Sequence, residues 1–353
     1  MYTTVGAAME NAAGDGTKAW NSGGSNILVR RVVQITMFLG GFGVLWMCFY
    51  LIVSPFEFPT FSPYFIDESS KGYYDPKLES VLRSACMKDK TVILTTLNDA
   101  WAEPGSVFEL FLESFRVGNQ TQRLLNHLVV ITYDQKTQAR CLYMHKHCHK
   151  LKSGDNFTGE VFYMTPNYLH MMWKRLEFLG SILDMGYNFV FTDCDIMWLR
   201  DPFKHFYKDA DFQIACDAFN GNSTDINNSP NAGFKYAKSN NRTIWFYKFW
   251  INSRSSYPEL NEQDVLNRIK MHPSISNMKV KIRFLSTSYF GGFCEVSKDL
   301  NKVTTMHANC CVGLNNKVHD LKILLEDWKR YIGLSQYDKT ESHPSWSVPQ
   351  SCK

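Results

Sequence analysis

The stretch NFVFTDCDIMWLRDP, from Asn188 to Pro202, decides the fold of this chain. Its apolar run ends in two carboxylates one residue apart, Asp193 and Asp195. In extended backbone, residues i and i+2 point to the same side, so both carboxylates can reach one hard divalent cation and a bound diphosphate. The alternative is an aspartate pair that caps the next turn, which explains one aspartate better than two. We expect Cys194 to pack beneath the site, since thiolates favour softer metals than Mn²⁺ or Mg²⁺.

Apolar, β-rich runs alternate with helical patterns on both sides of this stretch. Apolar residues spaced by three and four, from Phe108 to Phe115 and from Leu169 to Leu183, predict two helices. Strands are predicted over Thr91–Asp99, Leu128–Asp134, Asn188–Asp193, Asp211–Asp217 and Val280–Ser286. This order predicts an α/β fold with a mostly parallel sheet flanked by helices. Ligands of such sheets bind beyond the carboxyl ends of the strands.

A second decisive stretch lies near the N-terminus. Val32 to Val53 carries no charge and would form a helix of about 33 Å, which matches a hydrocarbon core of about 30 Å. A cleaved signal peptide is the alternative, but its apolar core would be shorter and would end at small residues. Arg30 and Arg31 precede the span, so we expect a single transmembrane signal anchor with a cytosolic N-terminus.

Sequons and cysteines agree with this orientation. Nine of the ten cysteines follow the span, on the side where disulfides persist. Among them, Cys141 and Cys148 are expected to form a disulfide rather than a zinc site with neighbouring histidines, whose spacing does not suit zinc. Five Asn-x-Ser/Thr sequons also follow the span, at Asn119, Asn156, Asn222, Asn227 and Asn241.

Composition bounds the remaining possibilities. The chain of 353 residues is 44% hydrophobic, which excludes disorder throughout. Its net charge is only +4, and the basic residues are scattered, so a nucleic-acid partner is not expected. The predicted division is a cytosolic tail (1–31), the anchor (32–53), a proline-rich luminal stem (54–88), a catalytic domain (89–335) and a C-terminal tail (336–353).

Four motifs together resemble a known family. FTDCDIMWLRDP, NSPNAGF, NEQDVLN and MHANCCVGLNNK are similar to motifs of the plant nucleotide-diphospho-sugar transferases of glycosyltransferase family 77, over about Lys90 to Leu334. The resemblance implies a GT-A, Rossmann-type fold, a UDP-sugar donor, Mn²⁺ or Mg²⁺, and retention of anomeric configuration. It also implies a Golgi location, a cell-wall glycan or glycoprotein acceptor, and association with other Golgi transferases.

The resemblance assigns roles to several residues. Asp193 and Asp195 resemble the family's DxD ligands of the metal and donor phosphates, and His307 resembles the late metal ligand. A packed or surface histidine is the alternative for His307. Lys317 resembles the diphosphate-binding lysine, near a predicted turn from Gly313 whose backbone N–H groups could meet a phosphate. A solvated lysine is its alternative.

Other residues are expected near the transferred sugar. Asn231 and Gly233 resemble the loop that lines donor sugar and acceptor, although Asn-Ala-Gly after Ser-Pro would form a turn in any case. Gln263 and Asp264 resemble catalytic positions, with Asp264 near the anomeric carbon, where a carboxylate can stabilise an oxocarbenium-like transition state. Their alternative is favourable placement of acidic residues in the first turn of a helix.

Three residues are predicted to bind the nucleotide side of the donor. Thr95 and Asn98 end the first strand, where uracil and ribose would lie under the switch-point rule. Lys174 resembles a family position near the donor, and an ordinary exposed lysine is the alternative.

The sequence therefore predicts a type II membrane, metal-dependent glycosyltransferase that moves a pentose or galactose from a UDP-sugar. The main alternative is an inactive luminal scaffold or glycan-binding protein with the same fold, since a fold alone does not establish activity. A metal-dependent phosphohydrolase is disfavoured, because a second cluster of carboxylates and histidines for a two-metal site is not apparent.

Overall fold

The computed structural model describes residues 75–152, 154–155 and 157–352. The predicted tail, the anchor at 32–53 and most of the stem lie outside these residues. Among the helices that the structure describes, none is both long and apolar enough to cross a membrane.

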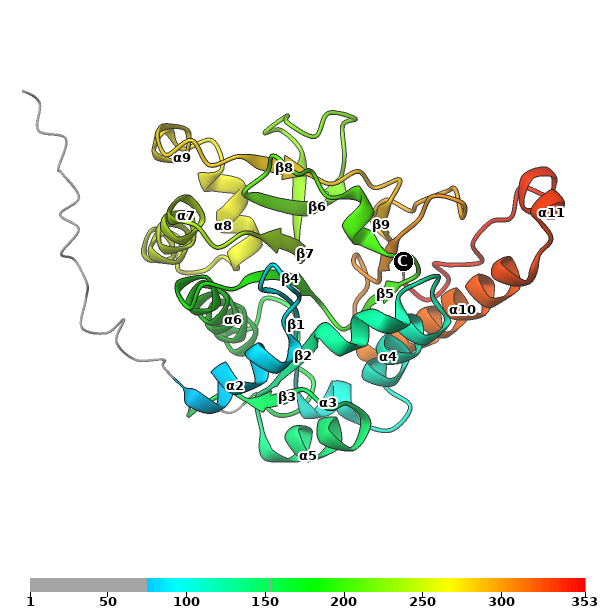
Figure 1. The fold of residues 1–353 in the computed structure, drawn as a ribbon, viewed down its shortest axis with the longest axis horizontal. Coiled ribbons are helices and arrows are strands. Elements are labelled where there is room, and N and C mark those ends of the chain that lie inside the picture. Colours follow the sequence, from blue (N-terminus) through cyan, green and yellow to red (C-terminus); the bar gives the residue numbers. More distant parts are fainter. Residues whose placement is uncertain (1–74, 153, 156, 353) are drawn as a thin grey trace, which may run out of the picture. The chain divides into compact units, whose positions relative to one another are not determined.

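A mixed sheet forms the centre of the molecule (Figure 1). Within the described residues, its strand order is β3-β2-β1-β4-β7-β6-β8. Four of the six neighbouring strand pairs are parallel, and both antiparallel pairs involve β7. The strands are β1 (Thr91–Leu97), β2 (Leu128–Thr132), β3 (Cys148–Lys150), β4 (Asn188–Thr192), β6 (Phe212–Ala218), β7 (Ser229–Ala237) and β8 (Ile282–Phe284). The predicted α/β fold with a mostly parallel sheet is confirmed.

Strand β7 is the main departure from the predicted elements. The prediction placed Asn231 to Gly233 in a loop or turn, but these residues lie inside β7, between β4 and β6. The register between β6 and β7 shifts at Ile214/Ala215 and again at Cys216/Ala218, as in β-bulges. These irregularities accommodate the turn-forming sequence within a central strand.

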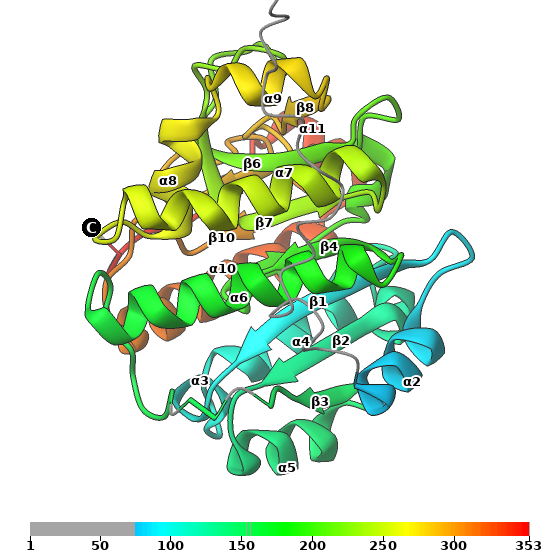
Figure 2. The same ribbon diagram turned by 90° about the vertical axis from the view of Figure 1, so that its left-hand side faces the viewer.

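Helices cover both faces of the sheet, and each face has its own apolar core. On one face lie α2 (Pro76–Ala85), α6 (Pro166–Asp184), α7 (Asn241–Asn252), α8 (Glu262–Ile269) and α9 (Pro273–Asn277). The other face is covered by α3 (Asp99–Ala102), α4 (Val107–Val117), α5 (Gln135–Met144) and α10 (Leu314–Gly333), which α11 (Gln336–Glu341) follows. Figure 2 shows α6 and α7 side by side across the first face.

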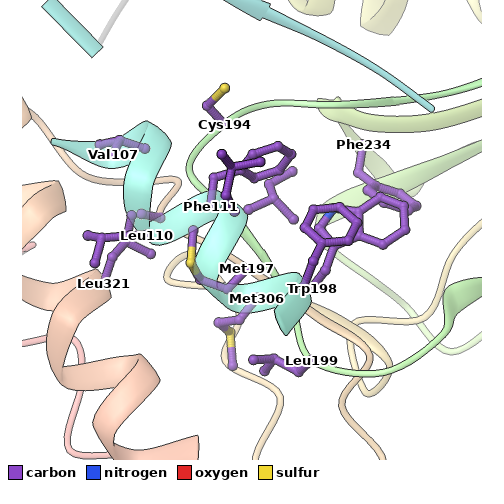
Figure 3. Close-up of a cluster of buried hydrophobic side chains, with 14 of the residues drawn as sticks. Val107, Leu110, Phe111, Cys194, Met197, Trp198, Leu199, Phe234, Met306 and Leu321 are labelled. Atoms are coloured by element: carbon purple, nitrogen blue, oxygen red, sulfur yellow. The ribbon is translucent and has the colours of Figure 1, made fainter. Parts of the chain in front are cut away.

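A small second sheet completes the carboxyl side of β4. Its order is β5 (Ile196–Trp198), β10 (Thr305–His307) and β9 (Phe290–Gly292). His307 pairs with Ile196, so β10 brings His307 next to the segment that follows Asp193 and Asp195. Beneath it, Trp198 packs against Phe234 with ring centroids 5.7 Å apart, and Cys194 lies in the same cluster (Figure 3). The expected packing of Cys194 beneath the carboxylates is confirmed.

The two ends of the described region pack on this unit. The predicted stem includes α2, whose Leu78 and Leu82 are fully buried, so the packed region begins before the predicted boundary at residue 89. The segment predicted as a C-terminal tail is also fixed. Asp320 accepts hydrogen bonds from the backbone N–H groups of Gln350, Ser351 and Cys352.

Three disulfides join described residues. They are Cys141–Cys148, Cys294–Cys310 and Cys311–Cys352. The predicted pair Cys141–Cys148 is confirmed. In the described residues, the histidines beside this pair do not gather with other ligand groups into a metal-binding cluster.

Candidate active site

The site is built at the end of β4, where the chain leaves the central sheet. The backbone N–H of Asp193 donates to the carbonyl of Gly233 on β7 at 2.8 Å. The chain then turns, and the N–H of Ile196 donates back to the carbonyl of Asp193 at 3.2 Å. Asp195 is 2% exposed, while Asp193 is only partly buried. The two carboxylates therefore share one edge but differ in their access to solvent.

Three side chains converge at this edge. One ligand atom from each of Asp193, Asp195 and His307 lies within 4.8 Å of the others. Nε2 of His307 is 3.2 Å from Oδ1 of Asp195, and Nζ of Lys317 is 2.6 Å from its Oδ2. Burial raises the pKa of Asp195, but the charges of Lys317 and His307 outweigh burial and hold that pKa well below its usual range.

The chemistry of this cluster fits a divalent metal. Oδ1 of Asp195 is buried, and no described residue donates a well-aligned hydrogen bond to it. A buried carboxylate oxygen without a donor is unfavourable unless another positive group meets it. Two carboxylates and one imidazole are a ligand set that borderline and hard divalent cations accept. Asp193, Asp195 and His307 could therefore hold one metal ion.

Gly233 permits the close approach of these ligands. A Cβ atom built at this position would lie 2.6 Å from Cε1 of His307 and 2.8 Å from Oδ2 of Asp193. It would also lie 2.9 Å from Oδ1 of Asn231. Each distance is shorter than an ordinary van der Waals contact. The absence of a side chain at Gly233 is thus a geometric requirement of the cluster.

Arg175 links the first aspartate to α8. From α6, its guanidinium donates to Asp193 at 2.7 Å and to Glu262 at 2.5 Å. Burial would lower the pKa of Arg175, but the two carboxylates raise it above its usual value. Burial also raises the pKa of Asp193, against the lowering effect of Arg175.

A further carboxylate, beside the metal-ligand cluster, accepts hydrogen bonds from three side-chain amides. Asp217, at the end of β6, accepts from Nδ2 of Asn231 at 2.8 Å and from Nδ2 of Asn309 at 2.7 Å. Its other oxygen accepts from Nε2 of Gln263 at 3.0 Å. Oε1 of Gln263 in turn accepts from the N–H of Ala232 at 2.8 Å. Asp217 therefore ties three separate segments together beside the metal-ligand cluster.

Asp264 lies in the first turn of α8 but does not cap it. The N-cap is Asn261, whose Oδ1 accepts from the N–H of Asp264 at 2.8 Å. No described residue donates a hydrogen bond to the Asp264 carboxylate. Burial, with the charges of Glu262 and Asp217, raises the pKa of Asp264. Its carboxylate is thus available to a ligand at the edge of the site.

Comparison with known proteins identifies the family. Residues 123–321 match the nucleotide-diphospho-sugar transferase family. An uncharacterised Arabidopsis thaliana protein is 48% identical over 278 residues, which cover 78% of this chain and 73% of that protein. The chain belongs to the nucleotide-diphospho-sugar transferases. It is therefore a glycosyltransferase.

More distant relatives of this transferase carry assigned activities. The arabinosyltransferase RRA1 of Arabidopsis thaliana is 25% identical, over 60% of this chain and 48% of that enzyme. Among solved structures, a glycosyltransferase involved in glycosylation of the PBCV-1 major capsid aligns with a TM-score of 0.40 and 10% identity. That alignment covers 66% of this chain and 98% of the chain of the solved glycosyltransferase.

The polar side chains of some predicted site residues of the transferase contact other residues of the protein. Oγ1 of Thr95 is buried 3.2 Å from Sγ of Cys194. Asn98 caps α3 and donates to the carbonyls of Phe157 and Gly159. The ammonium of Lys174 pairs with Glu177 at 3.1 Å and does not join the metal-ligand cluster. Arg175, the next residue, is the α6 cation that contacts Asp193.

Asn231 and Gln263 lie beside the cluster but are held in place by hydrogen bonds. Both ends of the Gln263 amide are used, by Ala232 and Asp217. Gln263 therefore positions β7 and Asp217. The sequence predicted Lys317 near a loop turn that begins at Gly313. The structure instead places Lys317 at the start of helix α10, whose N-cap is Gly313.

Sequence reasoning did not select Arg175, Asp217 or Asn309 as site residues. Asp217 ends the strand DFQIACD, and the rule that ligands bind beyond strand ends could have selected it. Asn309 follows His307 by two residues, so the spacing that pairs Asp193 with Asp195 could have selected it. Arg175 carried no comparable signal, because adjacent basic residues on a helix differ only in which face they occupy.

Proposed function

We propose that this transferase moves a pentose or galactose from a UDP-sugar to a hydroxyl group of a cell-wall glycan or glycoprotein, within a GT-A fold. The observation that carries the proposal is the convergence of Asp193, Asp195 and His307 at the end of β4, next to Lys317. These three ligands would hold Mn²⁺ or Mg²⁺, which when bound neutralises charge on the leaving diphosphate.

Residues of this chain would bind the diphosphate beside that cluster. Lys317 lies in the first turn of the 20-residue helix α10, where Gly313 is the N-cap and the N–H of Leu314 donates to the carboxylate of Glu160 at 2.8 Å. A helix N-terminus and an ammonium group both favour a phosphate anion. Lys317 is 16% exposed at its side chain, so it is desolvated enough to interact strongly.

Asp264 is the proposed residue for the transferred sugar. Its carboxylate is not needed as a cap, and none of the described side chains hydrogen-bonds to it. A carboxylate near the anomeric carbon stabilises developing positive charge, and this interaction exists mainly in the transition state. The relationship to an arabinosyltransferase supports a pentose donor. We propose that transfer retains the anomeric configuration.

We further propose a type II Golgi membrane protein with the described region in the lumen, associated with other Golgi transferases. The apolar span 32–53 and the arginines before it support the anchor. Three disulfides support an oxidising compartment. Four of the sequon asparagines are exposed, at Asn119, Asn222, Asn227 and Asn241, and Asn156 lies outside the described residues.

Substitution of Asp195 tests the function. In the full-length protein, Asp195→Ala should abolish metal-dependent UDP binding while thermal unfolding stays cooperative, because this carboxylate supports a cation rather than the apolar core. Asp184→Ala, at an exposed carboxylate that ends α6, is the matched control and should bind UDP as the wild type does. Titration calorimetry with UDP and Mn²⁺ measures both. Equal UDP affinity of the Asp195 variant and the wild type would overturn the metal role and favour the scaffold alternative.

A further inference from the structure

A loop between β3 and α6 crosses the edge of the proposed donor site. Asn98 donates to the carbonyls of Phe157 at 3.3 Å and Gly159 at 2.9 Å, and Asp99 accepts from the N–H of Gly159 at 2.6 Å. Farther along, Oε1 of Glu160 accepts from the N–H of Leu314, the first residue of α10, at 2.8 Å. The loop is therefore fixed at one side to the end of β1 and at the other to α10.

Two large aromatic side chains on this loop face solvent. Phe162 is 58% exposed and Tyr163 is 63% exposed. The Tyr163 ring is held edge-on against Tyr168 with centroids 5.2 Å apart, and Thr165, which caps α6, donates to the carbonyl of Phe162 at 2.7 Å. Two adjacent exposed aromatic side chains form an apolar surface, and the Tyr163 hydroxyl adds a polar group to it, which suits a binding surface.

Tyr163 also lies next to Asn261, the N-cap of α8. Its hydroxyl is 3.5 Å from Nδ2 of Asn261, the residue whose Oδ1 holds the N–H of Asp264. Partial burial raises the pKa of Tyr163, and the charges of Asp264 and Asp217 raise it further. Through Asn261, the exposed ring lies beside the first turn of α8, which carries the Asp264 carboxylate.

This combination matches the chemistry of a sugar ring. A pyranose or furanose presents an apolar C–H face, which packs on an aromatic ring, and an edge of hydroxyls, which donate to carboxylates. The diphosphate end of a donor would be held at Lys317, whereas Tyr163 lies beside the start of α8 and Asp264. The ring is thus on the side of the site where a sugar acceptor would meet the transferred sugar.

We propose that Tyr163, with Phe162 beside it, is the platform on which the sugar ring of a glycan acceptor stacks, with its hydroxyls directed toward Asp264. The inference rests on the proposed function and deepens it by assigning the acceptor subsite.

Direct binding of small glycosides to the full-length protein tests the platform. The probes are methyl glycosides of L-arabinose, L-fucose and D-galactose, titrated by ligand-observed NMR with Mg²⁺ and UDP present. Tyr163→Ala should weaken binding of the glycoside that the wild type prefers by about tenfold. Tyr163→Phe keeps the ring and should stay within about threefold. Tyr143→Ala, at a tyrosine 83% exposed on α5, is the matched control and should bind as the wild type does.

Three outcomes would overturn the platform. They are unchanged glycoside binding by Tyr163→Ala, an equal loss in Tyr163→Phe, or no binding of these glycosides to the wild type. UDP affinity, measured in the same samples, reports on the proposed function separately. Loss of glycoside binding with normal UDP binding in Tyr163→Ala supports the platform, whereas failure of the wild type to bind UDP would count against the donor site and leave the glycoside result to decide the platform.

Discussion

Gly233→Ala gives the sharpest test of how the metal-ligand cluster is assembled. The added Cβ would lie 2.6 Å from Cε1 of His307, 2.8 Å from Oδ2 of Asp193 and 2.9 Å from Oδ1 of Asn231. The backbone at Gly233 is not in the left-handed region, so alanine meets crowding and no backbone strain. The substitution therefore changes one variable, the space around Gly233 that His307, Asp193 and Asn231 share. Asn231 in turn donates a hydrogen bond to Asp217.

The size of the effect follows from the overlap. Carbon atoms pack best at about 3.5–4.0 Å, so the contact with His307 is too close by roughly 1 Å. Overpacking of this kind costs about 1–3 kcal/mol. If the site relaxes by moving His307 and Asp193 apart, that free energy appears in metal-dependent binding, and about 1.4 kcal/mol corresponds to a tenfold change in affinity. We expect the dissociation constant for UDP with Mn²⁺ to rise by about tenfold to a hundredfold.

Calorimetry and thermal unfolding on the full-length protein measure the two parts of this cost. Gly333→Ala is the matched control, because a Cβ at Gly333 would meet no atom within 4 Å. That control should keep wild-type UDP affinity. The reasoning fails if Gly233→Ala binds UDP and Mn²⁺ as tightly as the wild type, since the cluster would then tolerate a side chain in its centre.

Three further predictions concern catalysis and stability. Asp264→Asn should lower kcat by about a hundredfold with little change in UDP affinity, because its charge acts mainly in the transition state; unchanged kcat in a steady-state assay would remove the role. Cys352→Ser opens a disulfide with a sequence separation of 41 and should cost about 4 kcal/mol in urea unfolding, and a loss below about 1 kcal/mol would contradict a structural role. Burial lowers the pKa of His147 to about 4 in the folded state. Between about pH 6.5 and 4 the unfolded state therefore binds the proton more readily, and the free energy of unfolding decreases as the pH is lowered. His147→Gln should flatten that fall in urea titrations at pH 7 and 5, and an identical pH dependence would exclude His147 as its source.

The ends of β1, β2 and β4 were predictable because these strands are buried, mostly apolar runs, and β4 leads directly into Asp193. The short parallel strand β3, Cys148–Lys150, was not predicted, because its three residues form no apolar run. Strand β7 was not predictable from the sequence, because it contains Pro230 and Gly233, residues that disfavour a central strand. It is stabilised there by pairing on both sides, with β4 and β6, which a local pattern does not reveal.

The site residues beyond Asp193 and Asp195 depend on contacts between distant segments. Asp217 acquires its place only because Asn231, Gln263 and Asn309 come from three different parts of the chain. Likewise, Lys174 and Arg175 differ by one helical position, and only the packing of α6 determines that Arg175 is buried against Asp193. Such choices require tertiary structure, because helix periodicity fixes the spacing of faces but not which face meets a ligand.

Covalent links also position the late part of the site. Cys310 and Cys311 lie between His307 and Lys317 in the chain, and each belongs to a different disulfide, with Cys294 and Cys352 respectively. Four cysteines allow three pairings, so the sequence alone did not choose among them. Because Cys352 lies in the segment predicted as a tail, that segment helps to hold α10, and with it the ammonium that contacts Asp195. The geometry at Asp195 is therefore set jointly by the end of β4, by the pairing of β10 and by the last residues of the chain.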